Sequence, residues 1–206
     1  MALFYQHNIN ADSRLGIWHI TENEEFFKNG IAIQKEITHP HKRLQHYAGR
    51  YLLKVLDPDF PVADILLDGN RPYLKNNHFY FSISHWQNFA AAIVSRSQRV
   101  GIDIEGEAEK LETLQKKYMT DGELQHLLSA NHSIPLRKLL CICWSSKETM
   151  FKWYQKGKVD FREDMIVSAI HEKERTLSTL FRKEKKENLT IQYHSFGKMI
   201  LTYLHT

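Results

Sequence analysis

The sequence predicts an α+β fold, arranged as a pseudo-dimer of two similar α/β halves within 206 residues. Amphipathic helical periodicity and alternating strand patterns both occur before and after about residue 98, in the same order of strand, helix and strands. No long stretch rich in Pro, Gly or Ser separates the two series. We therefore expect an N-terminal half over 1–98 and a C-terminal half over 99–206.

The N-terminal half should begin with a strand over 14–20. A capping box, Thr21-x-x-Glu24, predicts a short helix, and Thr38 with Pro40 predicts a longer one that ends near Leu56. Apolar residues of this longer helix recur at helical spacing and should form its buried stripe. These are Leu44, Tyr47, Ala48, Tyr51, Leu52 and Val55, and the opposite side carries Lys42, Arg43, His46, Arg50 and Lys54.

Strands should follow that helix. The turn residues 68–70 separate two short apolar runs, which predicts a hairpin. Alternation over 79–84 predicts a half-buried strand, and the continuous apolar run 89–94 predicts a buried central one. We expect the segment 99–105 to pair next to that central strand.

The C-terminal half should contain three helices followed by four strands. Helices are predicted over 107–118, over 120–130 behind the capping box Thr120-x-x-Glu123, and over 135–155 before Gly157. Short strands are predicted over 165–171, 175–181, 189–195 and 199–205, with the charged run 182–188 as an exposed loop.

Composition favours a soluble globular protein. Hydrophobic residues make up 42% of the chain and charged residues 25%, and no apolar run reaches the ~18 residues that a membrane span needs. The first ten residues lack a signal pattern, so we expect a cytoplasmic protein. Cys141 and Cys143 are the only cysteines, and on a helix they diverge too far for a disulfide, so we expect buried thiols.

Three carboxylates in two short segments form the main candidate site. Asp103 and Glu105 point to one face of a predicted strand, and Glu148 lies on the long helix four residues before Lys152. Carboxylates at about 5 Å repel by roughly 3 kcal/mol at an effective dielectric of 20, so the group needs a cation or a raised pKa. Mg²⁺ with a phosphate ligand fits such a set. The alternative is two solvated edge acids and a surface helix pair, against which stand the large apolar neighbours of Glu148.

Basic residues form a second candidate site. Arg43, His46, Arg50 and Lys54 follow one side of the predicted helix over 40–56, where arginine forks suit phosphate and an ordinary hydrated face is the alternative. The net charge of +4 agrees with an anionic partner, such as nucleic acid, a phosphorylated small molecule or an acidic protein. His85 ends a strand and is a weaker candidate.

Two motifs resemble the signature of the 4′-phosphopantetheinyl transferases. The segments V-G-I-D-I-E (100–105) and W-S-S-K-E-T-M-F-K (144–152) match the family pattern G-[IV]-D-[IV]-E followed by [FW]-x-x-K-E-x-x-x-K. The segments 42–50, 69–74 and 81–85 also resemble family segments, in the right order. The resemblance covers roughly 40–160, and 1–37 and 160–206 carry no family motif. Arg71 stands where the family has Lys, and Trp86 where it often has Ser, a change that bears on carrier docking or substrate tolerance.

The resemblance implies a fold and a reaction. The length is similar to that of the long, two-repeat members that activate peptide and polyketide synthetases, which are monomeric pseudo-dimers with coenzyme A bound between α+β halves. The implied reaction moves the 4′-phosphopantetheine group of coenzyme A to a serine of an acyl or peptidyl carrier protein and releases adenosine 3′,5′-bisphosphate. Mg²⁺, or Mn²⁺ in its place, would be the metal.

The resemblance also implies roles for individual residues. Asp103, Glu105 and Glu148 would hold the metal, and Glu148 would accept the serine proton. Lys147 and Lys152 would contact phosphates, with Lys152 also at the leaving group. The remaining implied contacts are with coenzyme A: Arg43, Arg50 and His85 at the 3′-phosphate, and Arg71, Pro72 and Ser84 near the adenine.

Two other functions are alternatives to the transferase reaction. A basic nucleic-acid-binding module would use the helix over 40–56, but the acid trio would repel phosphate without a metal. A metal-dependent phosphohydrolase would need further His or Asp ligands for a two-metal site, and no such set stands out.

Overall fold

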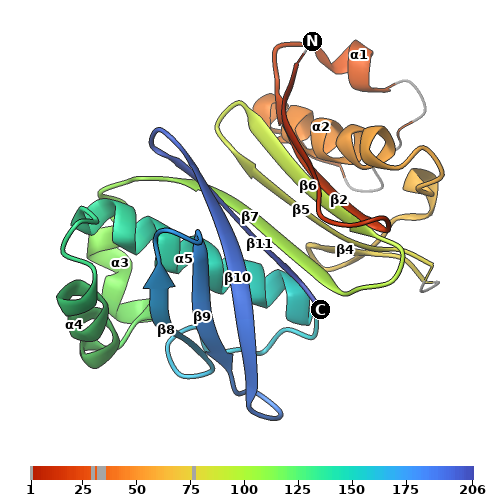
Figure 1. The fold of residues 1–206 in the computed structure, drawn as a ribbon. Coiled ribbons are helices and arrows are strands. Elements are labelled where there is room, and N and C mark those ends of the chain that lie inside the picture. Colours follow the sequence, from red (N-terminus) through yellow and green to blue (C-terminus); the bar gives the residue numbers. More distant parts are fainter. Residues whose placement is uncertain (1, 29–30, 32–35, 76–77) are drawn as a thin grey trace. The chain divides into compact units, whose positions relative to one another are not determined.

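A computed structural model describes residues 2–28, 31, 36–75 and 78–206 and shows a mixed α+β protein (Figure 1). The chain divides into two compact units, Met1–Ile102 with His205–Thr206, and Asp103–Leu204. The division lies inside a strand, after Ile102, whereas the sequence predicted it after residue 98.

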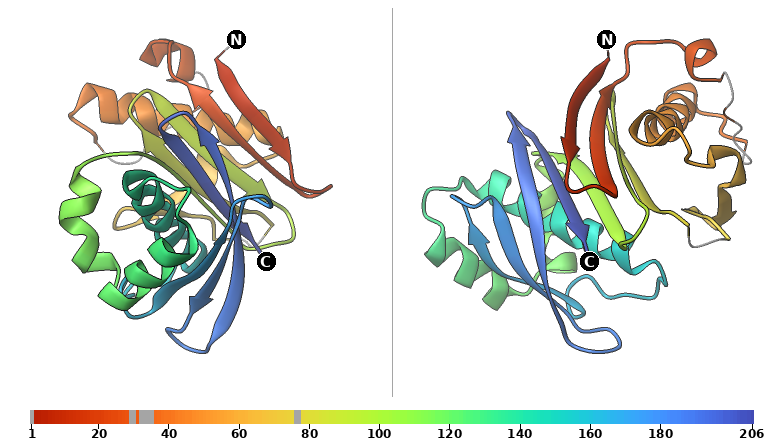
Figure 2. Two further views of the ribbon diagram at one scale, coloured as in Figure 1. Left: turned by 60° about the vertical axis from the view of Figure 1, so that its left-hand side comes forward. Right: turned by 45° about the vertical axis from the view of Figure 1, so that its right-hand side comes forward.

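The N-terminal unit contains a four-stranded antiparallel sheet in the order β1-β2-β6-β5. Helix α2 lies along one face of this sheet, as the right-hand view of Figure 2 shows. A separate hairpin, β3-β4, turns at Gly69, whose φ of +62° explains the glycine. The elements are β1 (Leu3–Asn8), β2 (Ser13–His19), α1 (Glu24–Lys28), α2 (Pro40–Leu56), a 3₁₀ turn (Val62–Asp64), β3 (Leu66–Asp68), β4 (Arg71–Tyr73), β5 (Tyr80–Trp86) and β6 (Phe89–Ser95).

Helix α2 approaches strand β5 closely at Gly49. A Cβ on Gly49 would lie 2.6 Å from Cγ2 of Ile83, so the helix approaches the strand only because this residue has no side chain. Ala48 and Leu52 are fully buried on the same helix, as the apolar stripe predicted, whereas Val55 of that stripe is exposed. Arg50 is also buried, although the sequence placed it on the hydrated side, because the helix packs so near the sheet around Gly49.

The C-terminal unit contains a five-stranded sheet in the order β7-β11-β10-β9-β8, with α5 along one face (Figure 1). Backbone bonds between Arg99 and Thr206 in both directions, and from Glu107 N to Lys198 O, make β7 and β11 antiparallel. The elements are β7 (Val100–Gly106), α3 (Lys110–Tyr118), α4 (Asp121–Ala130), α5 (Leu136–Tyr154), β8 (Met165–His171), β9 (Thr176–Phe181), β10 (Glu187–Phe196) and β11 (Met199–His205).

Most predicted elements are present, and several expectations need correction. β10 begins at Glu187, so the predicted loop over 182–188 ends two residues early. β7 pairs with β11 rather than with the central strand β6, because its partner comes from the far end of the chain. β1 was not predicted, since its half-buried pattern contains few strongly apolar residues. The helix caps also differ: Asn23 Oδ1 accepts from Phe26 N at 3.2 Å and His39 Nδ1 from Lys42 N at 3.4 Å, in place of Thr21 and Thr38.

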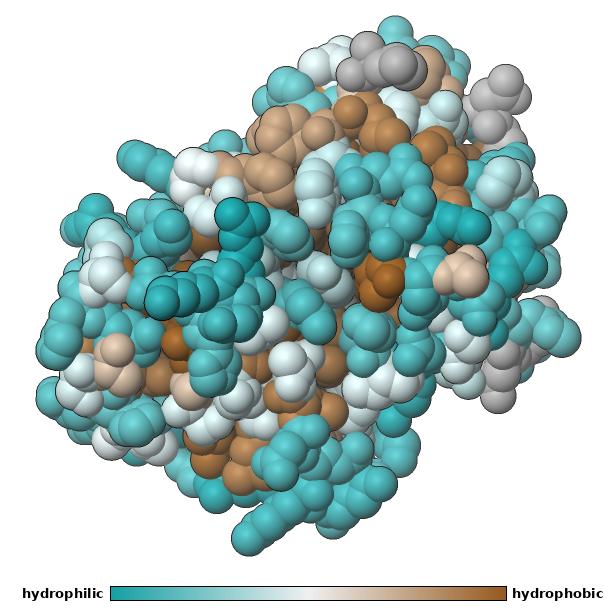
Figure 3. Space-filling view, in the orientation of Figure 1, coloured by the Kyte–Doolittle hydropathy of each residue, from teal (hydrophilic) through white to brown (hydrophobic). Residues whose placement is uncertain are grey.

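The surface is mostly polar on the face drawn in Figure 3, where hydrophobic residues lie in patches between hydrophilic ones. None of the described helices combines the length and the apolar character required to cross a membrane.

Candidate active site

Asp103 on β7 is a buried carboxylate with charged and neutral donors on its two oxygens. It is 5% exposed, between Ile102 and Ile104, which are buried in the core. Ser145 Oγ donates to Oδ2 at 2.8 Å, and Lys152 Nζ donates to Oδ1 at 2.6 Å. Both donors come from α5, so these two bonds hold the helix and the carboxylate of β7 together. A solvated edge acid, the alternative considered from the sequence, does not describe this residue.

Glu148 lies on α5 beside that carboxylate and is half-buried. Burial, together with the negative charges of Asp103 and Glu105, raises the pKa of Glu148 to about 7, and the positive charge of Lys152 opposes this rise. The three acids therefore interact electrostatically within one unit. A carboxylate with a pKa near neutrality is suited to accept a proton at physiological pH.

Glu105, the third acid, follows Asp103 by two residues on β7. Its Oε1 accepts from the backbone of Gly106 at 3.0 Å, and its Oε2 lies 3.6 Å from Lys110 Nζ. The side chain is half-buried. Glu105 is thus close enough to affect the pKa of Glu148, while its oxygens are directed to its own neighbours.

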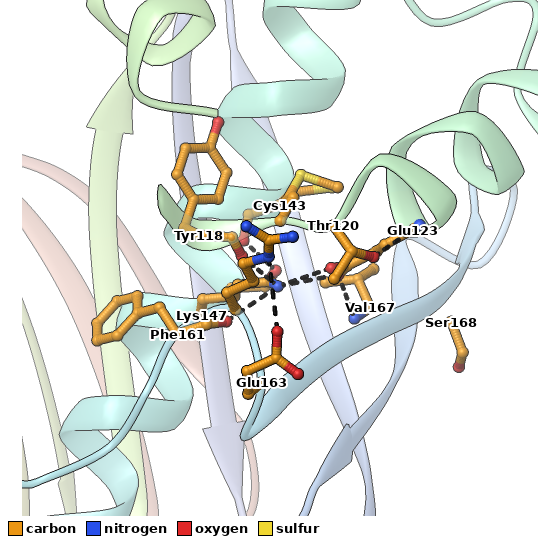
Figure 4. Close-up of polar contacts among 12 residues, drawn as sticks. Tyr118, Thr120, Glu123, Cys143, Lys147, Phe161, Glu163, Val167 and Ser168 are labelled. Atoms are coloured by element: carbon orange, nitrogen blue, oxygen red, sulfur yellow. Dashed lines mark hydrogen bonds and ion pairs between the residues drawn. The ribbon is translucent and has the colours of Figure 1, made fainter. Parts of the chain in front are cut away.

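Lys147, next to Glu148 in the sequence, is fully buried. Its ammonium points toward Glu123, Tyr118 and Phe161 (Figure 4). Its Nζ donates to Glu123 Oε2 at 3.0 Å, to Tyr118 O at 2.6 Å and to Phe161 O at 3.1 Å. These bonds use all three ammonium hydrogens. Lys147 therefore has no donor left for a phosphate, and the structure differs here from the phosphate contact that the motif implied.

Glu123, the partner of Lys147, is a residue of the site that the sequence did not predict. Its sequence signal is the capping box at the start of α4, which predicts a different role for it. Thr120 does cap that helix, because its Oγ1 accepts from Glu123 N at 3.1 Å. The carboxylate of Glu123, however, accepts from Lys147 through Oε2 and from Val167 N through Oε1 at 2.8 Å.

In the N-terminal unit, the basic residues of α2 have different surroundings. Arg50 is 4% exposed, and its NH1 donates to the carbonyl oxygen of His46 at 3.3 Å and contacts the Nδ1 of the same residue at 3.4 Å. Burial lowers the pKa of the Arg50 guanidinium. Within the described ranges no carboxylate forms an ion pair with it. The rings of His46 and His85 lie 5.7 Å apart, so His85 is next to the histidine that contacts Arg50.

The other basic candidates of this unit already have acidic partners. Arg43 forms an ion pair with Glu24 at 2.7 Å and donates to Ile37 O at 2.8 Å. Arg71 forms an ion pair with Asp68 at 2.7 Å across the β3-β4 hairpin. Pro72 lies in β4 beside Arg71, and Ser84 is buried in β5 next to His85.

Comparison with known protein families decides the class of the molecule. The model of the 4′-phosphopantetheinyl transferase superfamily matches residues 99–204, which is more than half of the chain and includes all three acids and α5. The chain belongs to this superfamily. No curated protein matches the sequence.

Membership in the 4′-phosphopantetheinyl transferase superfamily gives the reaction class. The protein is a transferase of the phosphopantetheinyl type, for which coenzyme A is the donor and carrier proteins are the acceptors. The superfamily typically uses a divalent metal. Whether the residues of this transferase suit such an ion depends on their chemistry and on their placement.

The donor chemistry of the acid trio fits a hard divalent cation. All three side chains offer carboxylate oxygens, and the negative charges of Asp103 and Glu105 add to burial in raising the pKa of Glu148. As the side chains stand, however, no three His, Cys, Asp or Glu residues in the described part of the chain converge into a metal-binding group. Lys152 occupies Oδ1 of Asp103, and Glu105 is directed to Gly106 and Lys110. Metal binding would therefore require these contacts to rearrange.

An open pocket of about 340 Å³ lies in the same unit of the transferase. Two of its walls, Tyr118 and Phe161, are held by the carbonyl bonds from Lys147. The ring of Trp144 contacts both, at 5.0 Å from Tyr118 and 5.5 Å from Phe161. Lys147 thus holds the backbone of two pocket-lining residues in place. The pocket is lined by Leu114, Lys117, Tyr118, Trp144, Val159, Asp160 and Phe161.

Proposed function

We propose that this protein transfers the 4′-phosphopantetheine group of coenzyme A to a serine of an acyl or peptidyl carrier protein and releases adenosine 3′,5′-bisphosphate. One observation carries the proposal: Asp103, Glu105 and Glu148 interact within the C-terminal unit, beside Lys152, and Glu148 has a pKa of about 7. The proposed enzyme is of the long, two-repeat type, acts as a monomer in the cytoplasm and uses Mg²⁺ or Mn²⁺. The net charge of +4 suits carrier proteins, which are usually acidic.

In the proposed reaction, Glu148 acts as the general base. The serine hydroxyl is a weak nucleophile, and a carboxylate with a pKa near 7 can accept its proton as the oxygen attacks the phosphorus that carries pantetheine. The bond from that phosphorus to the oxygen shared with the adenosine phosphate breaks, and the bisphosphate leaves with the electron pair. Glu148 is half-buried and close to other acids, so it stays basic in the site.

Lys152 is the proposed contact for the leaving group. The Lys152 side chain is 23% exposed and its ammonium is bound to Asp103. A diphosphate would compete with Asp103 for the ammonium, and Lys152 would then neutralise or protonate the leaving phosphate. A divalent cation on Asp103, Glu105 and Glu148 would supply charge neutralisation to the diphosphate when bound.

Arg50 is the strongest of the proposed contacts for the 3′-phosphate. It is a buried cation with no ion-pair partner among the described residues, and a phosphate would supply the missing negative charge. His85 and Arg43 are proposed for the same phosphate. Arg71, Pro72 and Ser84 are proposed near the adenine.

A mass-shift assay tests the function. An apo carrier protein incubated with coenzyme A and Mg²⁺ should gain the mass of one phosphopantetheine group. We expect Asp103→Ala and Glu148→Gln to abolish nearly all transfer, whereas Glu109→Gln, an exposed acid at the start of α3, should remain active. Carrier proteins of fatty-acid, polyketide and peptide pathways should be tried in parallel.

Two outcomes would contradict the proposal. Full activity of Asp103→Ala or Glu148→Gln would refute the assignment of the acid site. Release of adenosine 3′,5′-bisphosphate with no modification of any carrier would identify a phosphohydrolase, the alternative weighed from the sequence.

A further inference from the structure

Three buried hydroxyl groups form hydrogen bonds that connect Asp103 on β7 to the neighbouring strand β11. Ser145 Oγ lies 2.8 Å from Asp103 Oδ2 and 2.8 Å from Thr202 Oγ1. Thr149 Oγ1 lies 2.7 Å from Thr202 Oγ1 and 3.2 Å from Thr202 O. All three hydroxyl residues are fully buried. They form a continuous line from β11 through α5 to the carboxylate on β7.

The number of hydrogens fixes the direction of this line. Each hydroxyl has one hydrogen to donate, and an ionised carboxylate can only accept. Ser145 must therefore donate to Asp103, and Thr202 must donate to Ser145. Thr149 then donates its one hydrogen to Thr202, either to Oγ1 or to the carbonyl oxygen. The O–H dipoles of Thr202 and Ser145 consequently point the same way and end on the charge of Asp103, an arrangement in which each bond strengthens the next.

Ser146, the next residue of α5, shows what an ordinary buried serine does on this helix. It is as deeply buried as Ser145, but its Oγ donates to the carbonyl of Cys143 at 2.9 Å, three residues earlier on the same helix. Ser146 therefore satisfies itself locally, whereas Ser145 reaches two strands. The contrast shows that helix packing alone does not require the bonds of Ser145.

We propose that Ser145, backed by Thr202 and Thr149, is a positioning residue that orients Asp103 for the diphosphate and its metal. This inference rests on the proposed function. Ser145 donates to Oδ2 of Asp103 and so restrains rotation of the carboxylate about its Cβ–Cγ bond. This restraint remains when Lys152 leaves Oδ1 to bind the incoming diphosphate. The line of hydroxyls thereby keeps one oxygen of Asp103 in a fixed position during the exchange.

Metal binding gives the first test, because it does not depend on turnover. The affinity of the protein for Mn²⁺ in the presence of coenzyme A is measured from the free Mn²⁺ signal in electron paramagnetic resonance. We expect Ser145→Ala to weaken binding by about tenfold or more, as loss of a partner behind a metal ligand does. Ser146→Ala is the matched control and should bind Mn²⁺ as the wild type does.

A pair of substitutions at Thr202 keeps the test decisive if Ser145→Ala does not fold. Thr202→Val preserves the shape and removes the hydroxyl, and it should weaken Mn²⁺ binding. Thr202→Ser restores the hydroxyl and should restore the affinity. Equal affinities of these two variants, or of Ser145→Ala and Ser146→Ala, would overturn the inference.

The dependence of transfer on Mg²⁺ separates positioning from general damage. Ser145→Ala should need about tenfold more Mg²⁺ for half its maximal rate, and saturating Mg²⁺ should recover most of that rate. A variant that is slow at every Mg²⁺ concentration would overturn the positioning role. If the wild type modifies no carrier protein, the proposed function itself fails, and Mn²⁺ affinity distinguishes that result. Absence of Mn²⁺ binding by the wild type would overturn the inference together with the metal assignment.

Discussion

The two long helices of this protein each bury a cation, and they neutralise it in different ways. Lys147 on α5 has Glu123 at 3.0 Å, supplied by α4 of the same unit. Arg50 on α2 forms hydrogen bonds only with His46 among the described residues and has no carboxylate partner there. Both groups have a pKa lowered by burial, and Glu123 opposes that effect for Lys147. A buried cation that has its own counterion serves the fold, whereas one without it is suited to bind an anion from outside.

Removing the charge of Lys147 should have the largest effect. Lys147→Met leaves Glu123 as a buried carboxylate without its cation, so we expect a loss of about 3–5 kcal/mol in the free energy of unfolding. Urea denaturation followed by circular dichroism measures it. The double variant Lys147→Met/Glu123→Gln removes both charges and keeps an oxygen for Val167 N, and it should regain a large part of the loss. If Lys147→Met were as stable as the wild type, Lys147 would not differ from Arg50 in its importance for the fold.

Arg50→Met should give the opposite result, with weaker binding and nearly unchanged stability. We expect the affinity for coenzyme A to fall by about tenfold or more, the value of one or two hydrogen bonds to a charged group. Isothermal titration calorimetry with coenzyme A and with 3′-dephospho-coenzyme A measures both affinities. The second ligand should be almost unaffected. An equal loss for both ligands would show that Arg50 does not contact the 3′-phosphate.

The thiols of α5 should make the protein less stable in alkali. Burial raises the pKa of Cys141, of Cys143 and of the Tyr118 phenol, so the folded state keeps protons that the unfolded state loses. The contribution of these groups is complete below pH 9 and declines as the pH rises, by about 1.4 kcal/mol per thiol for each pH unit. The lowered pKa of Lys147 acts in the opposite direction, because the unfolded lysine binds the proton more tightly.

Urea denaturation at pH 8 and at pH 10 tests this dependence. A Cys141→Ala/Cys143→Ala variant should lose less stability between the two values than the wild type. The same slope in both proteins would mean that the thiols ionise in the folded state.

Among these variants, Arg43→Ala should have the smallest effect on stability and on the affinity for coenzyme A. Arg43 already pairs with Glu24, and both side chains are partly exposed, so its loss should change the free energy of unfolding only slightly. Its effect on coenzyme A affinity should be on the order of threefold, below that of Arg50→Met, because the phosphate must compete with Glu24. A larger effect than that of Arg50→Met would reverse the order that the structure predicts.

Much of the fold could be predicted from the sequence because its signals are local. The strands β8 and β11 match their predicted limits, and α5 ends one residue before the predicted limit. The pairing of β7 could not be predicted in the same way, since its partner β11 lies almost a hundred residues further along the chain. Strand neighbours depend on the packing of the whole unit, which alternation does not encode.

The candidate site was also predicted only in part. The motif spacing places Asp103, Glu148 and Lys152 together, as the structure shows through the bond between Lys152 and Asp103. It did not separate Lys147 from Lys152, because a sequence does not tell which side of a buried helix meets another helix. Arg50 was assigned to a hydrated face for the same reason, since the close contact at Gly49 becomes visible only when α2 lies on the sheet.

The helical geometry of α5 makes the motif sensitive to insertions. Ser145, Thr149 and Lys152 lie along one side of the helix and reach β7 and β11, and Lys147 lies on another side and reaches α4. An α-helix turns by about 100° per residue, so one inserted residue between Ser145 and Lys152 would rotate everything after it by that angle. Substitutions along this segment change one contact each, whereas a single insertion or deletion would dismantle several at once. The number of residues between its motif positions is therefore a stricter constraint on this enzyme than the identity of any one of them.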